Sequence, residues 1–453
     1  MNEHNTVHDR AERIAELKNQ VRLRTPVSGD LFHRALEVYP NGEISAARGF
    51  DPYPFYVDRA QGPYIWDVDG NRYIDCCMCY GVHLLGHRPP AVTEALKAQL
   101  ERHTHWGAPH PAEIEFAEKF TQCVPCAEMC ILCNTGNEAV HKAVSLARAY
   151  SGRDRVAKFE GGFHGSNEYS MWSVGLDPER MGPAERPNAV PQAGGMAAWA
   201  GESILILPFA HDNAFRLIEE HAHELAVVMT EPVFGSGNLA HDKGFLRELR
   251  DVTRKNDVLL LFDEIITGFR LALGGGQERF GVTPDIGLFG KALAGATAIG
   301  AIGTRSEIVE KAIALDPPLS VAGTFSGNAM TIAAANAMLD YLMANPQIYD
   351  DLEKKGDTLR AGFNGFAQAR GLPATMTGVG SMFQTILAEP PVAKPRDLLR
   401  EDAEAVEEFS LRLRLNGVFI PLHLALLSPA HSDADVEQVL QAHRDALLAC
   451  FED

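Results

Sequence analysis

The chain has 453 residues and a formal net charge of −19. Hydrophobic residues make up 46% of it and charged residues 22%, which is typical of globular proteins and excludes the disordered and fibrous classes. The negative charge argues against sequence-independent binding to nucleic acid or to an anionic membrane surface, since both require a positive face. No apolar run approaches the about 18 residues of a membrane span. The first residues are polar, so we expect a cytoplasmic protein.

The N-terminal part predicts a helix followed by a hairpin. Residues 9–24 have a helical period, and we expect them to pack on their own domain or on a partner subunit. Residues 64–75 alternate on both sides of an Asp-Gly-Asn turn, which predicts a β-hairpin. We expect residues 1–85 to form a segment that joins a smaller domain.

The middle of the chain predicts an α/β domain. Helical patterns alternate there with short aliphatic runs, which are continuous and therefore predict strands covered on both faces. Seven such strands separated by helices describe an open, mostly parallel seven-stranded sheet, which we place in a large domain over residues 86–330. The predicted strands span residues 129–133, 155–158, 204–207, 226–230, 258–262, 286–290 and 299–302.

The C-terminal part changes pattern. After residue 330, long helical stretches alternate with short strands, which predicts a smaller α+β domain over residues 331–453. Residues 165–201, within the large domain, are rich in Gly, Pro, Met and Trp and have no clear period. A connection of that length is usually a lid or a disordered segment.

Four of the eight cysteines have a spacing that invites a metal hypothesis. Cys123, Cys126, Cys130 and Cys133 read C-x₂-C-x₃-C-x₂-C. However, residues 129–133 read as a strand, which would point Cys130 and Cys133 to opposite faces. We therefore favour reduced, buried cysteines and no metal site, and keep a non-catalytic metal-binding or Fe–S protein as the alternative.

Polar groups follow the ends of several predicted strands. Thr135, Gly136 and Asn137 stand between a strand and a helix, where free backbone N–H groups could bind a phosphate, although such turns are common in α/β proteins. Phe163 and His164 follow a second strand, and the aromatic ring could stack on a flat ligand or belong to the core. Parallel strands bring such ends to one edge of the sheet, where ligands bind.

Three further strand ends carry the groups of greatest chemical interest. Glu231 and Asp263 end two strands, and Lys291 follows a third. A lysine and an aspartate in such positions are what pyridoxal phosphate requires: the lysine forms a Schiff base with the aldehyde, and the aspartate keeps the pyridine nitrogen protonated. Asp263 with its neighbour could also hold Mg²⁺ in an ATPase, but the required glycine-rich phosphate loop is absent from the sequence.

Longer stretches of the chain carry a family resemblance. From about residue 32 to residue 449 the chain resembles class III (fold type I) pyridoxal-phosphate aminotransferases, and it is most similar to the glutamate-1-semialdehyde aminomutase group. The stretches that carry the resemblance are residues 64–70, 85–87, 158–165, 263–270 and 323–328. The family implies a fold type I transferase that binds pyridoxal 5′-phosphate and forms a homodimer with shared active sites.

The resemblance also implies roles for single residues. Lys291 would bind the cofactor covalently, with Asp263 at the pyridine nitrogen. Ile265 and Phe163 would sandwich the ring, and His164 and Glu231 would lie beside it. The phosphate would sit on the turn formed by Thr135, Gly136 and Asn137, and Thr324 would reach it from the second subunit. Arg48 stands where aminomutase-like enzymes place a carboxylate-binding arginine, so Arg48 and Tyr80 are the expected substrate contacts.

The chain departs from the aminomutase pattern in places. The phosphate turn usually begins with Ser-Gly, whereas Thr135 stands first here, but the backbone donors for a phosphate remain. The aminomutase's Ser-Trp is replaced by Cys79-Tyr80, and residues 418–427 lack its C-terminal glutamate, and these two departures decide which reaction we favour. We therefore favour ping-pong transamination from an amino acid or amine donor to a keto acid or aldehyde acceptor. Glutamate-1-semialdehyde 2,1-aminomutase is the alternative, followed by a racemase or decarboxylase of the same fold.

Overall fold

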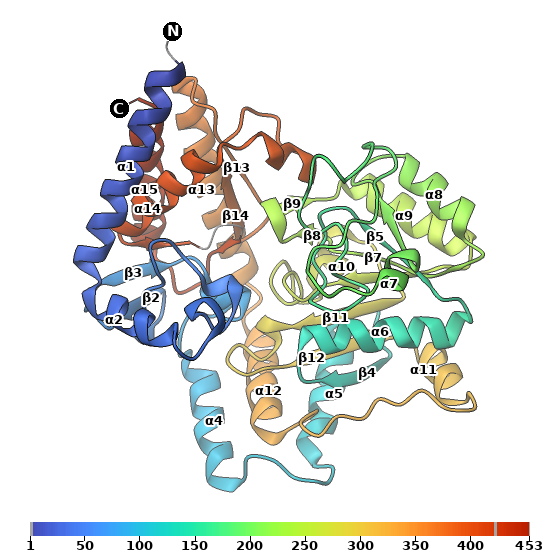
Figure 1. Ribbon diagram of the computed structural model, residues 1–453. Helices are drawn as coiled ribbons and strands as arrows, with labels where there is room; N and C mark the ends of the chain where they lie inside the picture. Colours follow the sequence, from blue (N-terminus) through green and yellow to red (C-terminus); the bar gives the residue numbers. More distant parts are fainter. Residues whose placement is uncertain (1–2, 421–423, 453) are drawn as a thin grey trace.

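The computed structural model describes residues 3–420 and 424–452, and a seven-stranded sheet organises its larger part (Figure 1). The order of the strands is β4-β12-β11-β10-β7-β5-β6. Strand β12 runs antiparallel to both of its neighbours, and the remaining pairs are parallel. The strands are β4 (Met129–Cys133), β5 (Arg155–Phe159), β6 (Ile204–Leu207), β7 (Leu225–Thr230), β10 (Leu259–Asp263), β11 (Ile286–Gly290) and β12 (Gly300–Thr304). The predicted seven-stranded, mostly parallel α/β fold is confirmed.

Helices cover both faces of this sheet, which explains why its strands are continuously apolar. On one face, Leu259 and Leu261 of β10 share a hydrophobic cluster with α6 (Gly136–Ser151) and α11 (Ser306–Ile313). On the other face, Leu260 and Phe262 pack with α8 (Asn213–His221) and α9 (Lys243–Lys255). Alternate residues of one strand thus enter opposite clusters. In β4, likewise, Cys130 and Cys133 join different clusters, and all eight cysteines are unbridged.

The smaller part of the molecule combines both ends of the chain. The parallel pairing of β15 (Val418–Phe419) with β3 completes a four-stranded sheet of order β1-β2-β3-β15. Its other strands, β1 (Val57–Gln61), β2 (Tyr64–Asp67) and β3 (Arg72–Asp75), include the predicted hairpin. A three-stranded sheet holds β13 (Thr375–Thr377), β14 (Met382–Ile386) and β16 (Ala425–Leu426). The exact domain boundaries stay a prediction.

Long helices surround these small sheets. Helix α1 (Glu3–Arg24) packs on α14 (Ala403–Leu415), which also contacts α15 (Asp433–Phe451), while α15 packs on α13 (Ile348–Arg370). Helix α12 (Ala329–Ala344) packs on α4 (Pro90–Arg102) and α5 (Pro111–Cys123). The short elements are α2 (Pro26–Ala35), η1 (Pro40–Gly42), η2 (Ala46–Arg48), α3 (Met78–Gly81), α7 (Ala198–Glu202), β8 (Val233–Phe234), η3 (Ser236–Asn238), β9 (Leu239–Ala240), α10 (Gly275–Phe280), η4 (Lys291–Leu293) and η5 (Pro395–Arg400). Within the described ranges, no helix combines the length and apolarity needed to cross a membrane.

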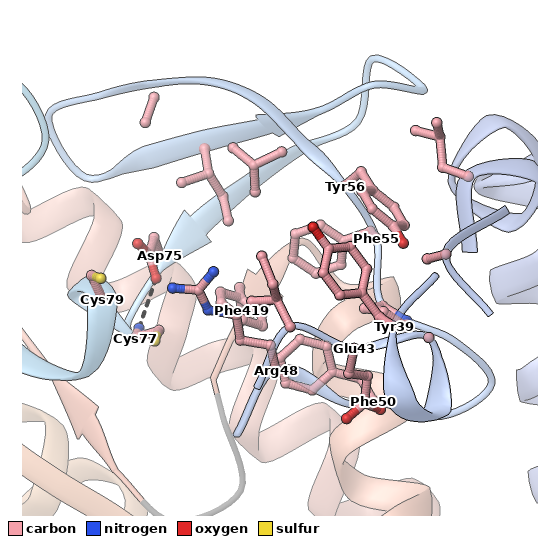
Figure 2. A pocket seen from close by; sticks show the side chains of 18 of the residues that line it. Tyr39, Glu43, Arg48, Phe50, Phe55, Tyr56, Asp75, Cys77, Cys79 and Phe419 are labelled. Carbon is pink, nitrogen blue, oxygen red and sulfur yellow. Dashed lines mark hydrogen bonds between the residues drawn. The ribbon is translucent and has the colours of Figure 1, made fainter. Parts of the chain in front are cut away.

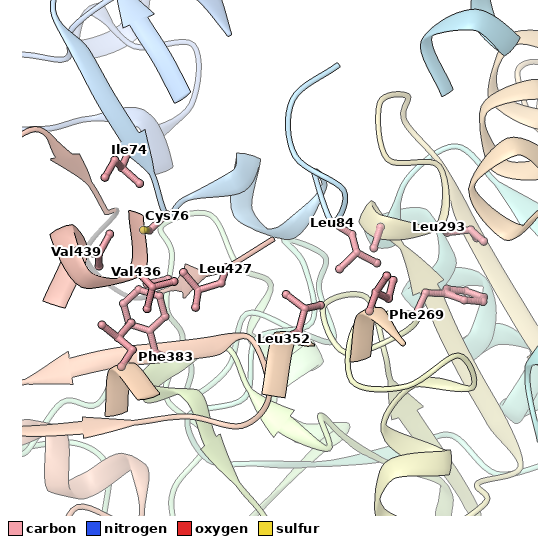
Figure 3. Close-up of a cluster of buried hydrophobic side chains, with 14 of the residues drawn as sticks. Ile74, Cys76, Leu84, Phe269, Leu293, Leu352, Phe383, Leu427, Val436 and Val439 are labelled. Atoms are coloured by element: carbon pink, nitrogen blue, oxygen red, sulfur yellow. The ribbon is translucent and has the colours of Figure 1, made fainter. Parts of the chain in front are cut away.

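One hydrophobic cluster links the two parts of the molecule. It runs from Ile74 in the four-stranded sheet, through Phe383 and Leu352, to Phe269 and Leu293 next to the large sheet (Figure 3). Fully buried Arg270 reinforces the link, because it donates hydrogen bonds to the Gly81 carbonyl (2.7 Å) and to the Leu427 carbonyl (3.3 Å). A shared core restricts movement of one part against the other.

The long connection between β5 and α7 is packed against the protein rather than disordered. The buried Lys158 ammonium donates hydrogen bonds to the carbonyls of Gly162 (2.7 Å), Ser170 (3.0 Å) and Trp172 (2.7 Å). Nearby, Arg396 pairs with the buried carboxylate of Glu160 through two hydrogen bonds of 2.7 and 2.9 Å. These contacts compensate for the absence of strands and helices along most of the connection.

Candidate active site

A cavity of about 390 Å³ lies at the edge of the large sheet where the predicted strand ends meet. The turn before α6, the segment after β5 and the ends of β7, β10 and β11 all contribute to its wall. Nine of the predicted cofactor contacts line it: Thr135, Gly136, Asn137, Phe163, His164, Glu231, Asp263, Ile265 and Lys291. Sheet topology brings these residues together although more than 150 positions separate the first from the last.

Asp263 is held by two partners. One carboxylate oxygen hydrogen-bonds to Nδ1 of His164 at 2.8 Å, and the other accepts the backbone N–H of Ile265 at 3.1 Å. Burial lowers the pKa of His164, and the hydrogen bond to Asp263 opposes this effect. Nε2 of His164 is buried and has no partner among the described residues. The pair therefore presents a fixed carboxylate at the carboxyl end of β10.

The Lys291 amine faces the same cavity. Burial lowers the pKa of Lys291 to about 8, although the nearby carboxylates Asp263 and Glu231 oppose the change. Within the described ranges, no hydrogen bond or ion pair engages the amine. The residue has φ 45°, in the left-handed region that costs a non-glycine residue about 1–2 kcal/mol. A strained, unpartnered lysine with a lowered pKa is suited to covalent bonding and proton transfer.

Glu231 organises the backbone around the cavity. Its two oxygens accept the N–H groups of Phe163 (3.0 Å) and Gly235 (2.9 Å). Burial, followed by the neighbouring Asp263 charge, raises the pKa of Glu231 to about 8. The side chain of Phe163 lines the cavity and is half-exposed. Ile265 also lines the cavity, and its side chain is partly buried. The geometry thus fixes the segment that carries Phe163 and His164.

The N-terminus of α6 offers donors to an anion. Thr135 caps the helix by accepting the N–H of Glu138 at 3.2 Å, while the first N–H groups of a helix have no intrahelical acceptor. The Asn137 side-chain oxygen accepts the N–H of Ser166 at 3.0 Å. A Cβ atom at Gly136 would come within 2.9 Å of the terminal methyl of Ile265, so a larger residue here would push that side chain aside.

These residues fit pyridoxal 5′-phosphate. The cavity combines an amine, a fixed carboxylate, apolar side chains and helix N–H groups, which match the aldehyde, ring nitrogen, ring faces and phosphate of that cofactor. In addition, the buried hydroxyl of Thr297 lines the cavity without a hydrogen-bond partner among the described residues. Sequence reasoning missed Thr297, because it belongs to no motif and lies in a loop.

The predicted substrate contacts, Arg48 and Tyr80, line a neighbouring cavity of about 860 Å³. The Tyr80 hydroxyl donates a hydrogen bond to the Ala47 carbonyl, and burial raises the pKa of Tyr80 to about 12. Thr324 is exposed and does not line the cofactor cavity of its own chain, within the ranges that the structure describes. Its predicted role in a second subunit stays a prediction. Of residues 418–427, positions 421–423 lie outside the described residues.

Comparison with known proteins identifies the family. The model of the family "Aminotransferase class-III" matches residues 45–440. This chain belongs to the class-III aminotransferases. It is 39% identical over 427 residues to glutamate-1-semialdehyde 2,1-aminomutase from Methanothermobacter thermautotrophicus, covering 93% of this chain and 98% of the relative. The predicted family and its cofactor, pyridoxal 5′-phosphate, are confirmed.

Solved structures give the same fold. An ω-transaminase from Sphaerobacter thermophilus matches with a TM-score of 0.88 and 34% identity, over 93% of this chain and 97% of that one. A transaminase with pyridoxal phosphate bound matches with a TM-score of 0.84 and 26% identity, over 94% and 98%. The curated relatives' name fits our alternative, the aminomutase, better than the two-substrate transamination that we favoured.

Proposed function

We propose that this class-III aminotransferase transfers an amino group of its substrate, with Lys291 as the lysine that binds the cofactor. The observation that carries the proposal is the meeting of the unpartnered Lys291 amine, the Asp263–His164 pair and the N-terminus of α6 in one cavity. An amine, a carboxylate and an anion site in this arrangement match the three polar ends of the family's cofactor. Once bound, that cofactor supplies an electron-accepting ring for the carbon that loses its proton.

The residues of this chain would divide the remaining work. Lys291 would bind the cofactor covalently and, when released, would carry a proton, for which a pKa of about 8 suits neutral pH. Asp263 would hold the ring nitrogen, with its orientation set by His164 and by the Ile265 N–H. Thr135, Gly136 and Asn137 would hold the phosphate. Phe163 and Ile265 would exclude water from the ring, because both present apolar surface to the cavity.

The first candidate reaction is that of glutamate-1-semialdehyde 2,1-aminomutase. Its support is the name of the curated relatives, the first of which aligns over nearly the whole of both chains at 39% identity. This reaction exchanges an amino and an oxo group within one molecule and needs no second substrate. Arg48 would bind the carboxylate of that substrate from the neighbouring cavity.

The second candidate is transamination between two substrates. A specific observation favours it: the neighbouring cavity measures about 860 Å³ and carries several aromatic side chains, which exceeds the needs of a five-carbon substrate. An ω-transaminase at 34% identity shares the fold, and this likeness is compatible with the second candidate. The two candidates share the cofactor site and differ only in whether an acceptor is required.

A spectral titration with product analysis tests the proposal and separates the candidates. The purified enzyme, loaded with pyridoxal phosphate, is mixed with glutamate 1-semialdehyde alone, and separately with L- and D-α-amino acids, β-amino acids and diamines. The visible spectrum and the products are then followed. Multiple turnovers of glutamate 1-semialdehyde without an acceptor would establish the aminomutase. A single conversion by an amine, completed only by an added keto acid or aldehyde, would establish the transaminase. No amino transfer with any compound would refute the proposal.

The homodimer is part of the proposal. Exposed Thr324 could complete the phosphate site of a second copy, as the resemblance implies. Mixing inactive Lys291→Ala with inactive Thr324→Ala tests this arrangement, because shared sites would regenerate one intact site in each hybrid dimer. We expect activity to return after subunit exchange. Lack of recovery in hybrids verified by native mass spectrometry would contradict a shared site.

A further inference from the structure

The larger cavity has a polar end and an apolar end. It lies between the four-stranded sheet and the N-terminal segment that covers this sheet (Figure 2). Arg48, Cys77 and Cys79 belong to the polar end, next to the α3 turn, whereas Phe50 and Phe55 belong to the apolar end. No established role accounts for the apolar end, which we call the aromatic chamber and define by Tyr39, Phe50, Phe55, Tyr56 and Phe419.

Ring contacts hold three walls of the aromatic chamber in place. Phe55 meets Phe419 edge to face, with ring centroids 5.0 Å apart, and its other side stacks on Tyr73 at 4.8 Å. Phe50 meets Phe419 edge to face at 5.4 Å. Such contacts stabilise the arrangement of the rings beyond the effect of burying their apolar surface. The walls are therefore preorganised, and a ligand would lose little energy in ordering them.

The register of strands β15 and β3 places the aromatic chamber near the α3 turn, which approaches Lys291. Phe419 of β15 lies opposite Asp75 of β3, so both side chains leave the same face of the sheet. Asp75 accepts the N–H of Cys77 at 2.8 Å and thereby fixes the start of α3. This helix carries Gly81, where a Cβ atom would lie 3.8 Å from Cδ of Lys291. The turn of α3 therefore has Lys291 on one side and the larger cavity on the other.

Arg48 supplies a positive charge at the polar end. Within the described ranges its guanidinium makes no hydrogen bond or ion pair, whereas Asp75 is already bound to His87 at 2.7 Å. Burial raises the pKa of Cys79, and the nearby charges of Arg48 and Lys291 oppose this rise. Cys79 lines the larger cavity together with Arg48, and it stands two residues before Gly81, which approaches Lys291. A substrate carboxylate at Arg48 would hold its amine-bearing carbon toward Lys291.

We propose that the aromatic chamber is the subsite for the substrate's side chain, and that it selects an aromatic or bulky apolar group on a carboxylate-bearing amine or its oxo counterpart. The inference rests on the proposed function, because it assigns the carboxylate to Arg48 and the reacting carbon to Lys291. Apolar walls favour burial of an apolar group in proportion to the apolar area that is removed from water. Glu37 and Glu43 oppose a second carboxylate in this cavity, although Arg34 also lines it.

Equilibrium binding of unreactive acids tests this inference without any turnover. 3-Phenylpropanoate and propanoate both carry a carboxylate, and neither has an amine that could react. Isothermal titration of the cofactor-loaded enzyme is expected to give 3-phenylpropanoate at least about tenfold tighter binding than propanoate. Equal affinities, or tighter binding of succinate than of 3-phenylpropanoate, would overturn the proposal.

Variants locate the site. Phe50→Ala and Phe419→Ala should each reduce the preference for 3-phenylpropanoate about fivefold or more, and Arg48→Ala should weaken both acids. Trp199→Ala is the matched control, because it removes an exposed aromatic ring outside the cavity, and we expect no change. Circular dichroism shows whether each variant is folded, and an unfolded phenylalanine variant is replaced by leucine at the same position (Phe50→Leu or Phe419→Leu). A preference that survives both phenylalanine substitutions would place the phenyl group elsewhere and refute the assignment.

The outcome also distinguishes this inference from the proposed function. If Lys291 does not transfer amino groups, the spectral titration fails while the binding preference for an apolar acid remains. If the aromatic chamber is wrongly assigned, amino transfer proceeds but the preference, or its loss in Phe419→Ala, is absent. The two failures therefore have separate readouts.

Discussion

The lowered pKa of Lys291 implies that this lysine costs the cofactor-free protein stability. Its pKa falls from 10.5 to about 8 on folding, so the unfolded state binds more protons between these two values, and stability rises with pH across that window. The cost is complete below pH 8 and vanishes as the pH approaches 10.5. At about 1.36 kcal/mol per pH unit, the difference corresponds to an upper bound of about 3.4 kcal/mol. Screening at the open cavity reduces it to about 1–3 kcal/mol.

The perturbation is Lys291→Met, which retains the shape of the side chain and removes its charge. At pH 7, urea unfolding of the cofactor-free variant should show about 1–3 kcal/mol more stability than the cofactor-free wild type. At pH 10 the gain should fall below about 1 kcal/mol, because the wild-type amine is then neutral in the folded state. A variant that is no more stable at pH 7, or a gain that does not shrink with pH, would refute the reasoning.

Lys158 provides the control. Burial lowers its pKa to about 7, but its ammonium donates to three carbonyls, so the lysine has a structural task that Lys291 lacks. At pH 10 the folded Lys158 side chain is a neutral amine that can still donate to two of the three carbonyls, so Lys158→Met should destabilise the protein by about 2 kcal/mol or more, because those carbonyls lose their donor. Lys291→Met should be nearly neutral at the same pH. Equal effects of the two substitutions would show that burial alone, rather than hydrogen bonding, sets their contributions.

Three further predictions follow from single contacts. Asp263→Asn removes the charge opposite the ring nitrogen and should lower kcat at least about 100-fold in steady-state assays at saturating cofactor; an unchanged rate would exclude the assigned role. Arg396→Met leaves Glu160 buried without its partner and should cost about 3–5 kcal/mol in urea unfolding, part of which Glu160→Gln in the same chain recovers; two additive losses would contradict the pairing. Gly136→Ala should weaken equilibrium cofactor binding about tenfold, because its Cβ would crowd an isoleucine at 2.9 Å, whereas Gly194→Ala, with open space around it, serves as the unaffected control.

Much of the large domain could be predicted from local patterns. Continuous aliphatic runs such as residues 226–230 and 258–262 can only be satisfied when both faces are covered, and the intervening helical periods supply the cover. The long connection after β5 could not be predicted as packed. Part of its order comes from the pair between Glu160 and Arg396, which are 236 residues apart, so no local window of sequence contains both partners.

The cofactor site, too, has features that the sequence predicts and features that depend on the tertiary structure. The sequence by itself determined which chemistry is available: Lys291 and Asp263 follow apolar strands, and parallel strands must bring their carboxyl ends to one edge. Only the tertiary structure decided that His164 holds Asp263, and that Phe419 pairs with β3 beside a cavity of about 860 Å³. The physical reason is that local periodicity reports which side chains are buried, whereas contacts between distant strands and loops depend on register and packing, which no local pattern encodes.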